Sequence, residues 1–203
     1  MCGIFGYVGE KRDAAEAVME GLRRLDYRGY DSWGVAVLDG SKIDTEKQVG
    51  IVSKEKPSLP ESTIGIGHTR WATHGKVSVP NAHPHYASDK SFVLAQNGIV
   101  ENVDELKLKL AEKGYEFISE TDTEVIVRLV EEKRKTAKSL EEAVRKAFKE
   151  LDGRNTIIVL ADNGDVIAAR NGSPLVLGMS ENAKELYFSS DVFSFAPHVA
   201  SVL

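Results

Sequence analysis

The sequence predicts an α+β fold in which antiparallel sheets are covered by helices. Strands and helices are mixed near the N-terminus, three helices then follow one another, and four strands end the chain. This order lacks the regular strand–helix alternation of a parallel, doubly wound sheet. Asn163-Gly164 lies between two alternating apolar segments and is a hairpin signal, and hairpins join antiparallel strands. No linker or repeat divides the chain, so we expect one domain over residues 1–203.

The N-terminal half is expected to contain four strands and one helix. The apolar, glycine-rich segment Gly3–Gly9 predicts a buried strand. Asp13 is expected to cap a helix, because apolar residues recur after it at helical spacing. These residues are Ala14, Ala15, Val18, Met19, Leu22 and Leu25. Further strands are expected at Trp33–Leu38, Thr63–Thr69 and Ser91–Gln96.

Two irregular segments separate these strands. Residues 40–62 are polar and uneven and contain Pro57 and Pro60, which predicts a connecting excursion without regular structure. Residues 71–90 combine Gly, Pro, His and Asn without a period, so we expect a long loop. A loop of that length inside a domain is usually functional or disordered.

The C-terminal half begins with helices expected over residues 102–113, 122–135 and 139–150. The last of these helices has the clearest apolar stripe, formed by Leu140, Ala143, Val144, Ala147, Phe148 and Leu151. The apolar period then changes to two, which indicates strands. These strands are expected at Thr156–Ala161, Val166–Arg170, Leu175–Gly178 and Glu185–Ser189.

Composition argues against several classes of function. The net charge is −5, from 26 basic and 31 acidic residues, so no overall positive field would attract nucleic acid or an anionic membrane. No apolar segment approaches the ~20 residues that span a bilayer, and no signal peptide is evident. The single cysteine rules out an internal disulfide and fits a reducing compartment. We therefore expect a cytoplasmic protein that binds neither nucleic acid nor membrane.

Cys2 is that only cysteine, and it directly follows Met1. Removal of Met1 would leave a free α-amine and a thiol on one residue, which is a nucleophile together with its base. Their ordinary pKa values, about 7.7–8.0 and about 8.5, are close enough for proton exchange near neutral pH. Taken alone, Cys2 is better explained as a small apolar core residue.

Two polar clusters end predicted strands. Arg70 lies in the segment HTRWATHG and offers a planar fork for a carboxylate, and Trp71 could cover a bound ligand. A surface Arg beside a core Trp would explain the same pair. Asn97 and Gly98 could together point an amide and a backbone N–H at a developing oxyanion. Asn-Gly is also the favoured two-residue hairpin turn, although the residues after it predict a helix start and not a return strand.

Two further clusters have structural explanations. Asp122 could receive a ligand's ammonium group, but Thr121 or Asp122 at this helix start is first explained as a cap. Four histidines suggest a metal site, yet no second cysteine, His-Glu-x-x-His motif or zinc spacing accompanies them. We therefore predict no metal site. The four are His68, His74, His83 and His85.

Taken together, these segments closely resemble the glutaminase domain of the glucosamine-6-phosphate synthase family (glutamine:fructose-6-phosphate amidotransferases). That domain is a class II glutamine amidotransferase of the N-terminal nucleophile hydrolase superfamily. The CGI start and the NG pair are common to class II enzymes. YRGYDS and HTRWATHG are specific to the glucosamine-forming branch and argue against the alternative of a phosphoribosyl amidotransferase. The matching segments are CGIFGYVG, LRRLDYRGYDS, HTRWATHG, NAHPH, NGIVEN, ETDTEV and GSPLVLG.

The resemblance implies a four-layer αββα sandwich of two antiparallel sheets, and it assigns roles in hydrolysis of L-glutamine through a γ-glutamyl thioester. Cys2 would be the nucleophile and its free amine the base, without metal or organic cofactor. The implied roles of the other residues are the oxyanion hole for Asn97 and Gly98, the α-carboxylate site for Arg70, Thr73 and His74, the α-amine site for Asp122, the closing loop for Trp71, and support of the nucleophile for Arg28.

The resemblance also implies partners, and the sequence departs from the family pattern at several places, among them Gln96 and Trp33. Complete enzymes of the family continue into sugar-isomerase domains that bind fructose-6-phosphate and use the ammonia, and we expect a full-length homodimer. This chain ends near Leu203, where the glutaminase domain ends, so the isomerase domains are expected to be absent. If Met1 stayed attached, the alternative would be a non-catalytic glutamine-sensing module. Gln96 stands where a histidine often precedes the NG pair, and Trp33 stands where a small residue follows YRGYDS.

Overall fold

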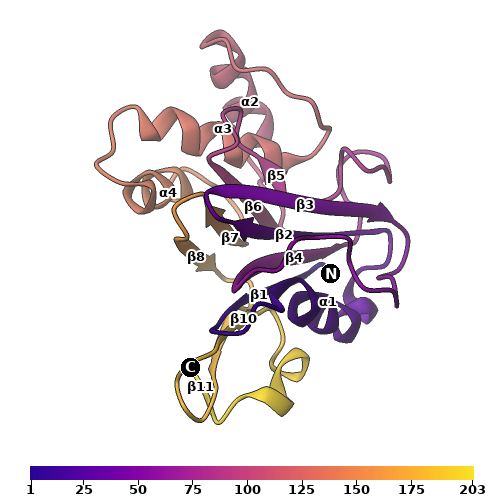
Figure 1. The fold of residues 1–203 in the computed structure, drawn as a ribbon. Helices are drawn as coiled ribbons and strands as arrows, with labels where there is room; N and C mark the ends of the chain where they lie inside the picture. Colours follow the sequence, from indigo (N-terminus) through magenta and orange to yellow (C-terminus); the bar gives the residue numbers. More distant parts are fainter.

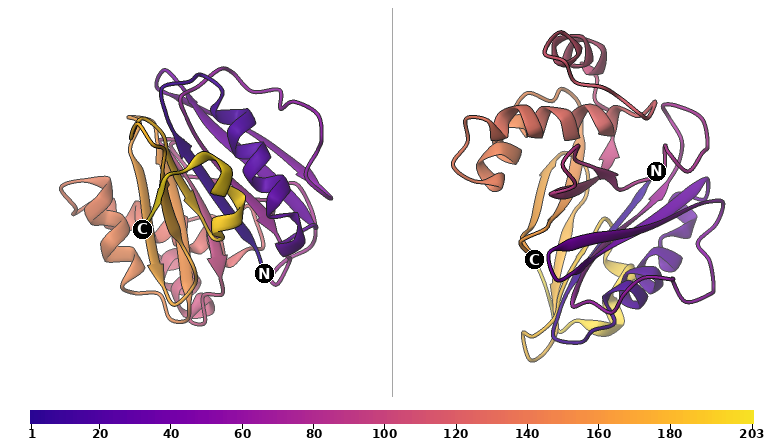
Figure 2. Two further views of the ribbon diagram at one scale, coloured as in Figure 1. Left: turned by 90° about the horizontal axis from the view of Figure 1, so that it is seen from below. Right: turned by 45° about the horizontal axis from the view of Figure 1, so that its top comes forward.

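The computed structural model describes residues 1–203, which form four layers, with two antiparallel sheets enclosed between helices (Figures 1 and 2). The predicted α+β class and αββα arrangement are confirmed. The larger sheet has the order β11-β9-β10-β1-β4-β2-β3, and the smaller sheet has the order β5-β6-β7-β8. The larger sheet contains β1 (Gly3–Val8), β2 (Ser32–Asp39), β3 (Lys42–Val49), β4 (Ile64–Arg70), β9 (Val176–Met179), β10 (Leu186–Ser189) and β11 (Ser201–Val202). The smaller sheet contains β5 (His85–Tyr86), β6 (Phe92–Gly98), β7 (Asn155–Ala161) and β8 (Val166–Asn171).

Alternation along the strands produces the two faces of each sheet. In β1, Ile4 joins the core between the sheets, whereas Phe5 and Tyr7 belong to the core on the outer side. In β6, Ala95 faces the other sheet and Leu94 faces outward. Because successive strand residues point to opposite faces, alternate residues of each strand belong either to the core between the sheets or to an outer core.

Helices cover both outer faces. The helix α1 (Ala14–Arg24) packs on the larger sheet through buried residues that include Val18, Met19 and Leu22. On the smaller sheet lie α2 (Val103–Glu112), α3 (Asp122–Arg134) and α4 (Leu140–Phe148), whose buried side chains meet those of β6 and β7. Figure 2 shows α1 on one side of the molecule and α3 and α4 on the other. No helix has the length and apolar character needed to cross a bilayer.

Most predicted elements agree with the structure. The short strand β5 lies within the loop expected over residues 71–90, β11 follows the last predicted strand, and two further differences concern β3 and α1. Residues 42–49 form β3, an edge strand paired with β2 along its whole length, and not the irregular excursion expected there. Its residues are mostly polar because only Ile43 is buried, so the apolar signal of a strand is missing. Asp13 precedes α1 as expected, but its side chain makes no cap hydrogen bond.

The sandwich brings one group of strand ends together. Gly3 at the start of β1 pairs with Thr69 near the end of β4. Gly98 ends β6 in the other sheet and pairs with Asn155 at the start of β7. The residues just outside or at these ends therefore meet between the two sheets, at one end of the sandwich.

Candidate active site

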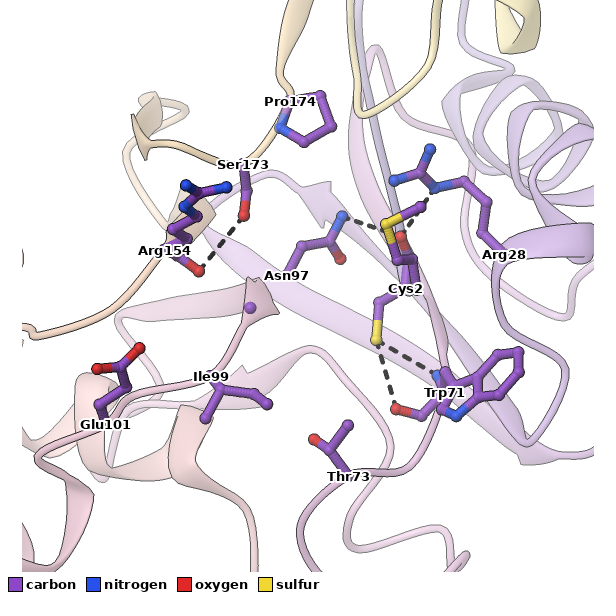
Figure 3. Close-up of a pocket in the computed structure, with 12 residues that line it drawn as sticks. Cys2, Arg28, Trp71, Thr73, Asn97, Ile99, Glu101, Arg154, Ser173 and Pro174 are labelled. Carbon is purple, nitrogen blue, oxygen red and sulfur yellow. Dashed lines mark hydrogen bonds between the residues drawn. The ribbon is translucent and has the colours of Figure 1, made fainter.

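The Cys2 thiol lies against the residue that follows β4. Trp71 N donates to Cys2 Sγ at 3.3 Å, and the thiol donates in turn to Trp71 O at 3.6 Å (Figure 3). Burial raises the pKa of the Cys2 thiol, and the Trp71 N–H and Arg70 act in the opposite direction. A buried thiol of this kind needs a local base to become a nucleophile.

The main-chain carbonyl of Cys2 is held from two sides. Arg28 Nε and Asn97 Nδ2 each donate to Cys2 O at 3.1 Å, and Figure 3 shows them approaching from opposite directions. Arg28 is buried and lies 3.6 Å from Asp191 through its NH1 nitrogen. The backbone of Cys2 is therefore held by one side chain from the turn after α1 and one from β6.

Asn97 and Gly98 end β6 beside Cys2, and the chain then turns into α2 and not into a hairpin. Gly98 has φ +129°, and a Cβ there would lie 2.1 Å from Arg154 O. Only glycine fits this close approach of two main chains. The Asn97 amide has a second hydrogen beyond the one given to Cys2, so it and the Gly98 N–H are both candidates to face an oxyanion.

Arg70 is the last residue of β4 and is almost fully buried. Its guanidinium donates to three carbonyls of the loop that follows, those of His74, Gly75 (3.4 Å) and Lys76 (3.1 Å). Burial lowers the pKa of Arg70 below its ordinary value. Arg70 therefore carries a buried positive charge at the site and organises the adjacent loop.

Asp122 lies at the start of α3, where the structure identifies the capping residue. Thr121 is the cap, because its side chain accepts from Glu124 N. The buried Asp122 carboxylate accepts from Val100 N through Oδ2 at 2.9 Å, which leaves Oδ1 available. Val100 lies two residues after Gly98, so Asp122 is tied to the turn that follows β6.

The remaining predicted side chains line the same region. Trp71 is 44 % exposed and packs its ring against Tyr30 at 5.5 Å between ring centroids. Thr73 and His74 lie next to each other in the loop, 3.4 Å apart between Oγ1 and Nδ1. A pocket is enclosed by residues from four of the predicted segments. Its lining includes Cys2, Arg70, Trp71, Thr73, His74, Gly98 and Asp122.

That pocket has a volume of only about 10 Å³, room for about one water molecule. A larger cavity of about 480 Å³ adjoins the small pocket and shares Cys2, Trp71, Thr73 and Gly98 with it. Its lining also includes Met1, Arg28, Asn97 and Arg154. Met1 is 76 % exposed and borders the larger cavity but not the small pocket. Cys2 therefore borders both spaces, whereas Met1 borders only the larger one.

Three of the four histidines considered as metal ligands are stacked in the interior. His68 and His83 have ring centroids 4.1 Å apart, and His83 and His85 have centroids 4.9 Å apart. Each has a hydrogen-bond partner other than a histidine, and no group of three or more His, Cys, Asp or Glu side chains is arranged to hold a metal ion. Burial lowers the pKa of His68 to about 3. His74 lies apart from them in the loop.

Sequence reasoning missed the residues that shape the loop after β4. Asp31 Oδ2 accepts from Ala72 N at 2.8 Å, and Glu120 Oε2 accepts from Lys76 N at 3.0 Å. Asp31 lies within YRGYDS and Glu120 within ETDTEV, so both were inside recognised motifs without an assigned role. Lys47, in the unpredicted strand β3, was also missed; its Nζ donates to the carbonyls of Ala82 at 2.6 Å and Pro84 at 3.2 Å.

Comparison with known proteins decides the family. The family model described as the glutamine amidotransferase domain matches residues 68–197, which is more than half of the chain. The chain belongs to the glutamine amidotransferase family. The matched region of this amidotransferase domain contains Arg70, Asn97, Gly98 and Asp122.

The most similar relatives agree with the predicted branch. The amidotransferase domain is 46 % identical over 209 residues to the isomerizing glutamine–fructose-6-phosphate aminotransferase of Thermococcus kodakarensis, covering 100 % of this chain and 34 % of the relative. The same enzyme of Clostridium perfringens is 46 % identical over 208 residues, with 100 % and 33 % covered. The chain thus spans about a third of the length of these relatives, and the resemblance stated above is confirmed.

A solved structure supports the fold at lower identity. The glutamine phosphoribosylpyrophosphate amidotransferase of B. subtilis superimposes with a TM-score of 0.83 at 27 % identity, covering 96 % of this chain and 43 % of that one. The sandwich is therefore the fold of known amidotransferases. The identity to the aminotransferases is the higher of the two, so the alternative of a phosphoribosyl amidotransferase is the weaker one.

Proposed function

We propose that this domain hydrolyses L-glutamine to glutamate and ammonia through a γ-glutamyl thioester on Cys2. The observation that carries the proposal is the pocket that Cys2, Arg70, Asp122 and Gly98 line together. Asn97, next to Gly98, donates to the Cys2 carbonyl at 3.1 Å. A zwitterionic amino acid needs one cationic and one anionic anchor. A thiol attacking its side-chain carboxamide needs donors for the oxyanion that forms.

The reaction begins with removal of Met1, which converts the Cys2 amide into a free amine. The amine takes the thiol proton, and the sulfur attacks the glutamine carboxamide to give a tetrahedral oxyanion held by Asn97 Nδ2 and Gly98 N–H. The protonated amine then gives its proton to the amide nitrogen of the tetrahedral intermediate. The carbon–nitrogen bond breaks, ammonia departs, and the γ-glutamyl thioester remains on Cys2. Water activated by the same amine hydrolyses the thioester and releases glutamate.

Substrate binding requires the loop after β4 to move. The small pocket has room for about one water molecule, and Arg70 is engaged by the carbonyls of His74, Gly75 and Lys76. We infer that the α-carboxylate of glutamine takes over part of the Arg70 fork, with Thr73 and His74 beside it. The free Oδ1 of Asp122 receives the α-ammonium group.

Arg28 and Trp71 have supporting roles in this proposal. Arg28 keeps the Cys2 carbonyl turned away from the substrate and fixes the nucleophile's backbone. Trp71 contacts the thiol through its main chain and lies in the loop that moves. No metal or organic cofactor has a step in the reaction.

The complete protein is proposed to be an isomerizing glutamine–fructose-6-phosphate aminotransferase that works in the cytoplasm. Support comes from the identity of 46 % to such enzymes and from the share of them that this chain spans. Residues 1–203 would be the glutaminase domain. Sugar-isomerase domains beyond it would bind fructose-6-phosphate and use the ammonia for glucosamine-6-phosphate, and the full-length protein would be a homodimer. The isolated chain is then expected to release glutamate without forming amino sugar.

The test combines intact mass with glutamine turnover. We expect glutamate release only from protein that lacks Met1, a γ-glutamyl adduct on Cys2 after rapid acid quench, and no turnover in Cys2→Ala. Glutamate release by Cys2→Ala, or by protein that retains Met1, would exclude the N-terminal nucleophile mechanism. Chain without Met1 that binds glutamine and never releases glutamate would instead identify a sensing module.

A further inference from the structure

Gln96 is the residue directly before the oxyanion pair, and every one of its polar atoms is engaged. Its side chain donates from Nε2 to Asn155 Oδ1 at 2.8 Å and accepts at Oε1 from Thr123 Oγ1 at 2.7 Å. Its main chain donates from N to His83 Nδ1 at 3.4 Å, and its carbonyl lies 2.9 Å from His68 Nε2. All five residues are buried.

The direction of each hydrogen bond in this network is determined. Asn155 Nδ2 donates to the main-chain carbonyl of Asp152 at 3.3 Å, so Asn155 Oδ1 is the atom that accepts from Gln96. Gln96 Oε1 must then accept from the Thr123 hydroxyl. Because that hydroxyl uses its only hydrogen on Gln96, it accepts from His83 Nε2, 3.1 Å away.

The same reasoning sets both histidine tautomers. His83 carries its hydrogen on Nε2, so its Nδ1 is free to accept from Gln96 N, and the network closes on the residue where it began. His68 faces a carbonyl through Nε2, so Nε2 carries the hydrogen there too. Both rings are neutral, as the lowered pKa values of these buried imidazoles require.

The network also contacts the proposed oxyanion pair, because Asn155 lies beside both Gln96 and Gly98. Gly98 pairs with Asn155 across β6 and β7, and a Cβ on Gly98 would come within 2.9 Å of Asn155 Oδ1. Asn155 Oδ1, which accepts the hydrogen bond from the Gln96 amide, is therefore also in close contact with Gly98. A shift of Gln96 or Asn155 would move the Gly98 N–H, and such donors act only when they are aimed at the oxyanion.

We propose that Gln96 is a positioning residue for the oxyanion hole, and that it acts by holding the main chain of Asn97 and Gly98 through Asn155, Thr123 and His83. The proposal rests on the proposed hydrolysis of glutamine. Gln96 contributes through geometry, so its loss slows the chemical step without weakening substrate binding or the nucleophile.

The experiment uses the Met1-free chain and four variants. In Gln96→Leu, which removes both side-chain hydrogen bonds, kcat is expected to fall at least about 10-fold, whereas full loss of an oxyanion donor costs about 10²–10³. The KM for glutamine and the rate of Cys2 alkylation by iodoacetamide should stay within about 2-fold, because neither uses the oxyanion hole. Thr123→Val should lower kcat in the same direction.

A rescue variant and a matched control separate positioning from mere stability. Gln96→His should retain most of kcat, because a neutral imidazole also offers one donor and one acceptor. Leu94→Ala creates a cavity on the same face of β6 and should lower the melting temperature while leaving kcat unchanged. A folded Gln96→Leu with normal kcat overturns the proposal, and so does an equal loss of kcat in Leu94→Ala. If Gln96→Leu does not fold, normal kcat in Thr123→Val overturns it.

A readout without turnover distinguishes this proposal from the proposed function. The ¹⁵N shifts of His83 should show hydrogen on Nε2 in the wild-type chain, and the Gly98 amide signal should move in Gln96→Leu but not in Leu94→Ala. An inactive wild-type chain with these signals would refute glutamine hydrolysis and leave the positioning of Gly98 standing. A Gly98 signal that ignores Gln96→Leu would refute the positioning even if the wild type is active.

Discussion

Asn97 donates its side-chain amide to the main-chain carbonyl of Cys2 at 3.1 Å. Asn97 belongs to the smaller sheet and Cys2 precedes the first strand of the larger one, so this bond ties the two sheets together at the nucleophile. The residue proposed as an oxyanion donor is consequently held next to the main chain of the residue proposed as the nucleophile. Catalysis by positioned dipoles depends on donors that are held in place, because no reorganisation is then needed when charge develops.

Asn97→Ala is expected to lower kcat for glutamine by about 10²–10³, with a smaller effect on KM, because it removes a donor used chiefly in the transition state. Steady-state glutamate release measures both constants. Asn163→Ala, in the exposed β7–β8 turn, is the control and should behave as wild type. An Asn97→Ala protein with an unchanged kcat would remove this residue from the oxyanion hole.

Arg70→Lys is expected to raise the KM for glutamine about 10- to 100-fold, in line with loss of a charge-assisted hydrogen bond. An ammonium group cannot reproduce the planar fork that serves three loop carbonyls here and that would serve a carboxylate in the complex. Isothermal titration with glutamine on the Cys2→Ala background measures affinity directly. Arg12→Lys, at an exposed ion pair with Glu61, is the matched control. Equal affinities of Arg70→Lys and the control would contradict the assignment.

Asp31→Ala is expected to raise the KM for glutamine about 10-fold, because Ala72 N loses a charged hydrogen-bond acceptor at the start of the moving loop. Asp31 is well placed for this role, since its own N–H donates to Arg70 O at 3.1 Å. Asp31→Asn keeps an acceptor oxygen, so its KM for glutamine should lie between those of the wild type and Asp31→Ala. Asp39→Ala, at the exposed β2–β3 turn, should change nothing. A KM that stays constant through the series would show that the loop does not depend on Asp31.

How far the sequence could predict this protein follows from what each residue signals locally. Apolar periods located the buried strands and helices, and the hairpin at Asn163-Gly164 was expected because its turn chemistry is local. The strand β3 was missed because an edge strand with one buried residue carries no apolar alternation. Its two-residue Gly40-Ser41 turn was the available signal, and Gly40 has φ +61°.

Site residues could be predicted where a motif contains a reactive or charged side chain. They could not be predicted where the side chain acts by holding main-chain atoms of another segment. Cys2, Arg70 and Asp122 carry reactive or charged groups, so their presence was readable. The contacts of Gln96 and Asp31 join residues from separate elements to backbone atoms, and no spacing in the sequence reveals such partners. The engagement of Arg70 by its own loop likewise depends on the loop's conformation.

The stacked histidines predict a steep loss of stability in weak acid. Burial lowers the pKa of His68 to about 3 and the pKa values of His83 and His85 well below their ordinary value, so all three are neutral in the folded chain. The unfolded chain binds a proton at each near its ordinary pKa of about 6.5. Folding stability is therefore fully present above pH 6.5 and is lost as the pH falls from there toward the folded pKa values.

With three such groups the slope approaches about 4 kcal/mol per pH unit between roughly pH 6 and 4.5, three times the 1.36 kcal/mol of a single proton. Carboxylates held low by ion pairs, such as Glu132 with a pKa of about 2, add most of their own loss below about pH 4.5, as the pH falls from the unfolded pKa toward the folded one. Urea unfolding at a series of pH values measures the slope. His85→Gln should reduce it by about a third, and His198→Gln, which removes a surface imidazole, should leave it unchanged. A free energy of unfolding that is flat from pH 7 to 5 would mean that the buried imidazoles do not take up protons on unfolding.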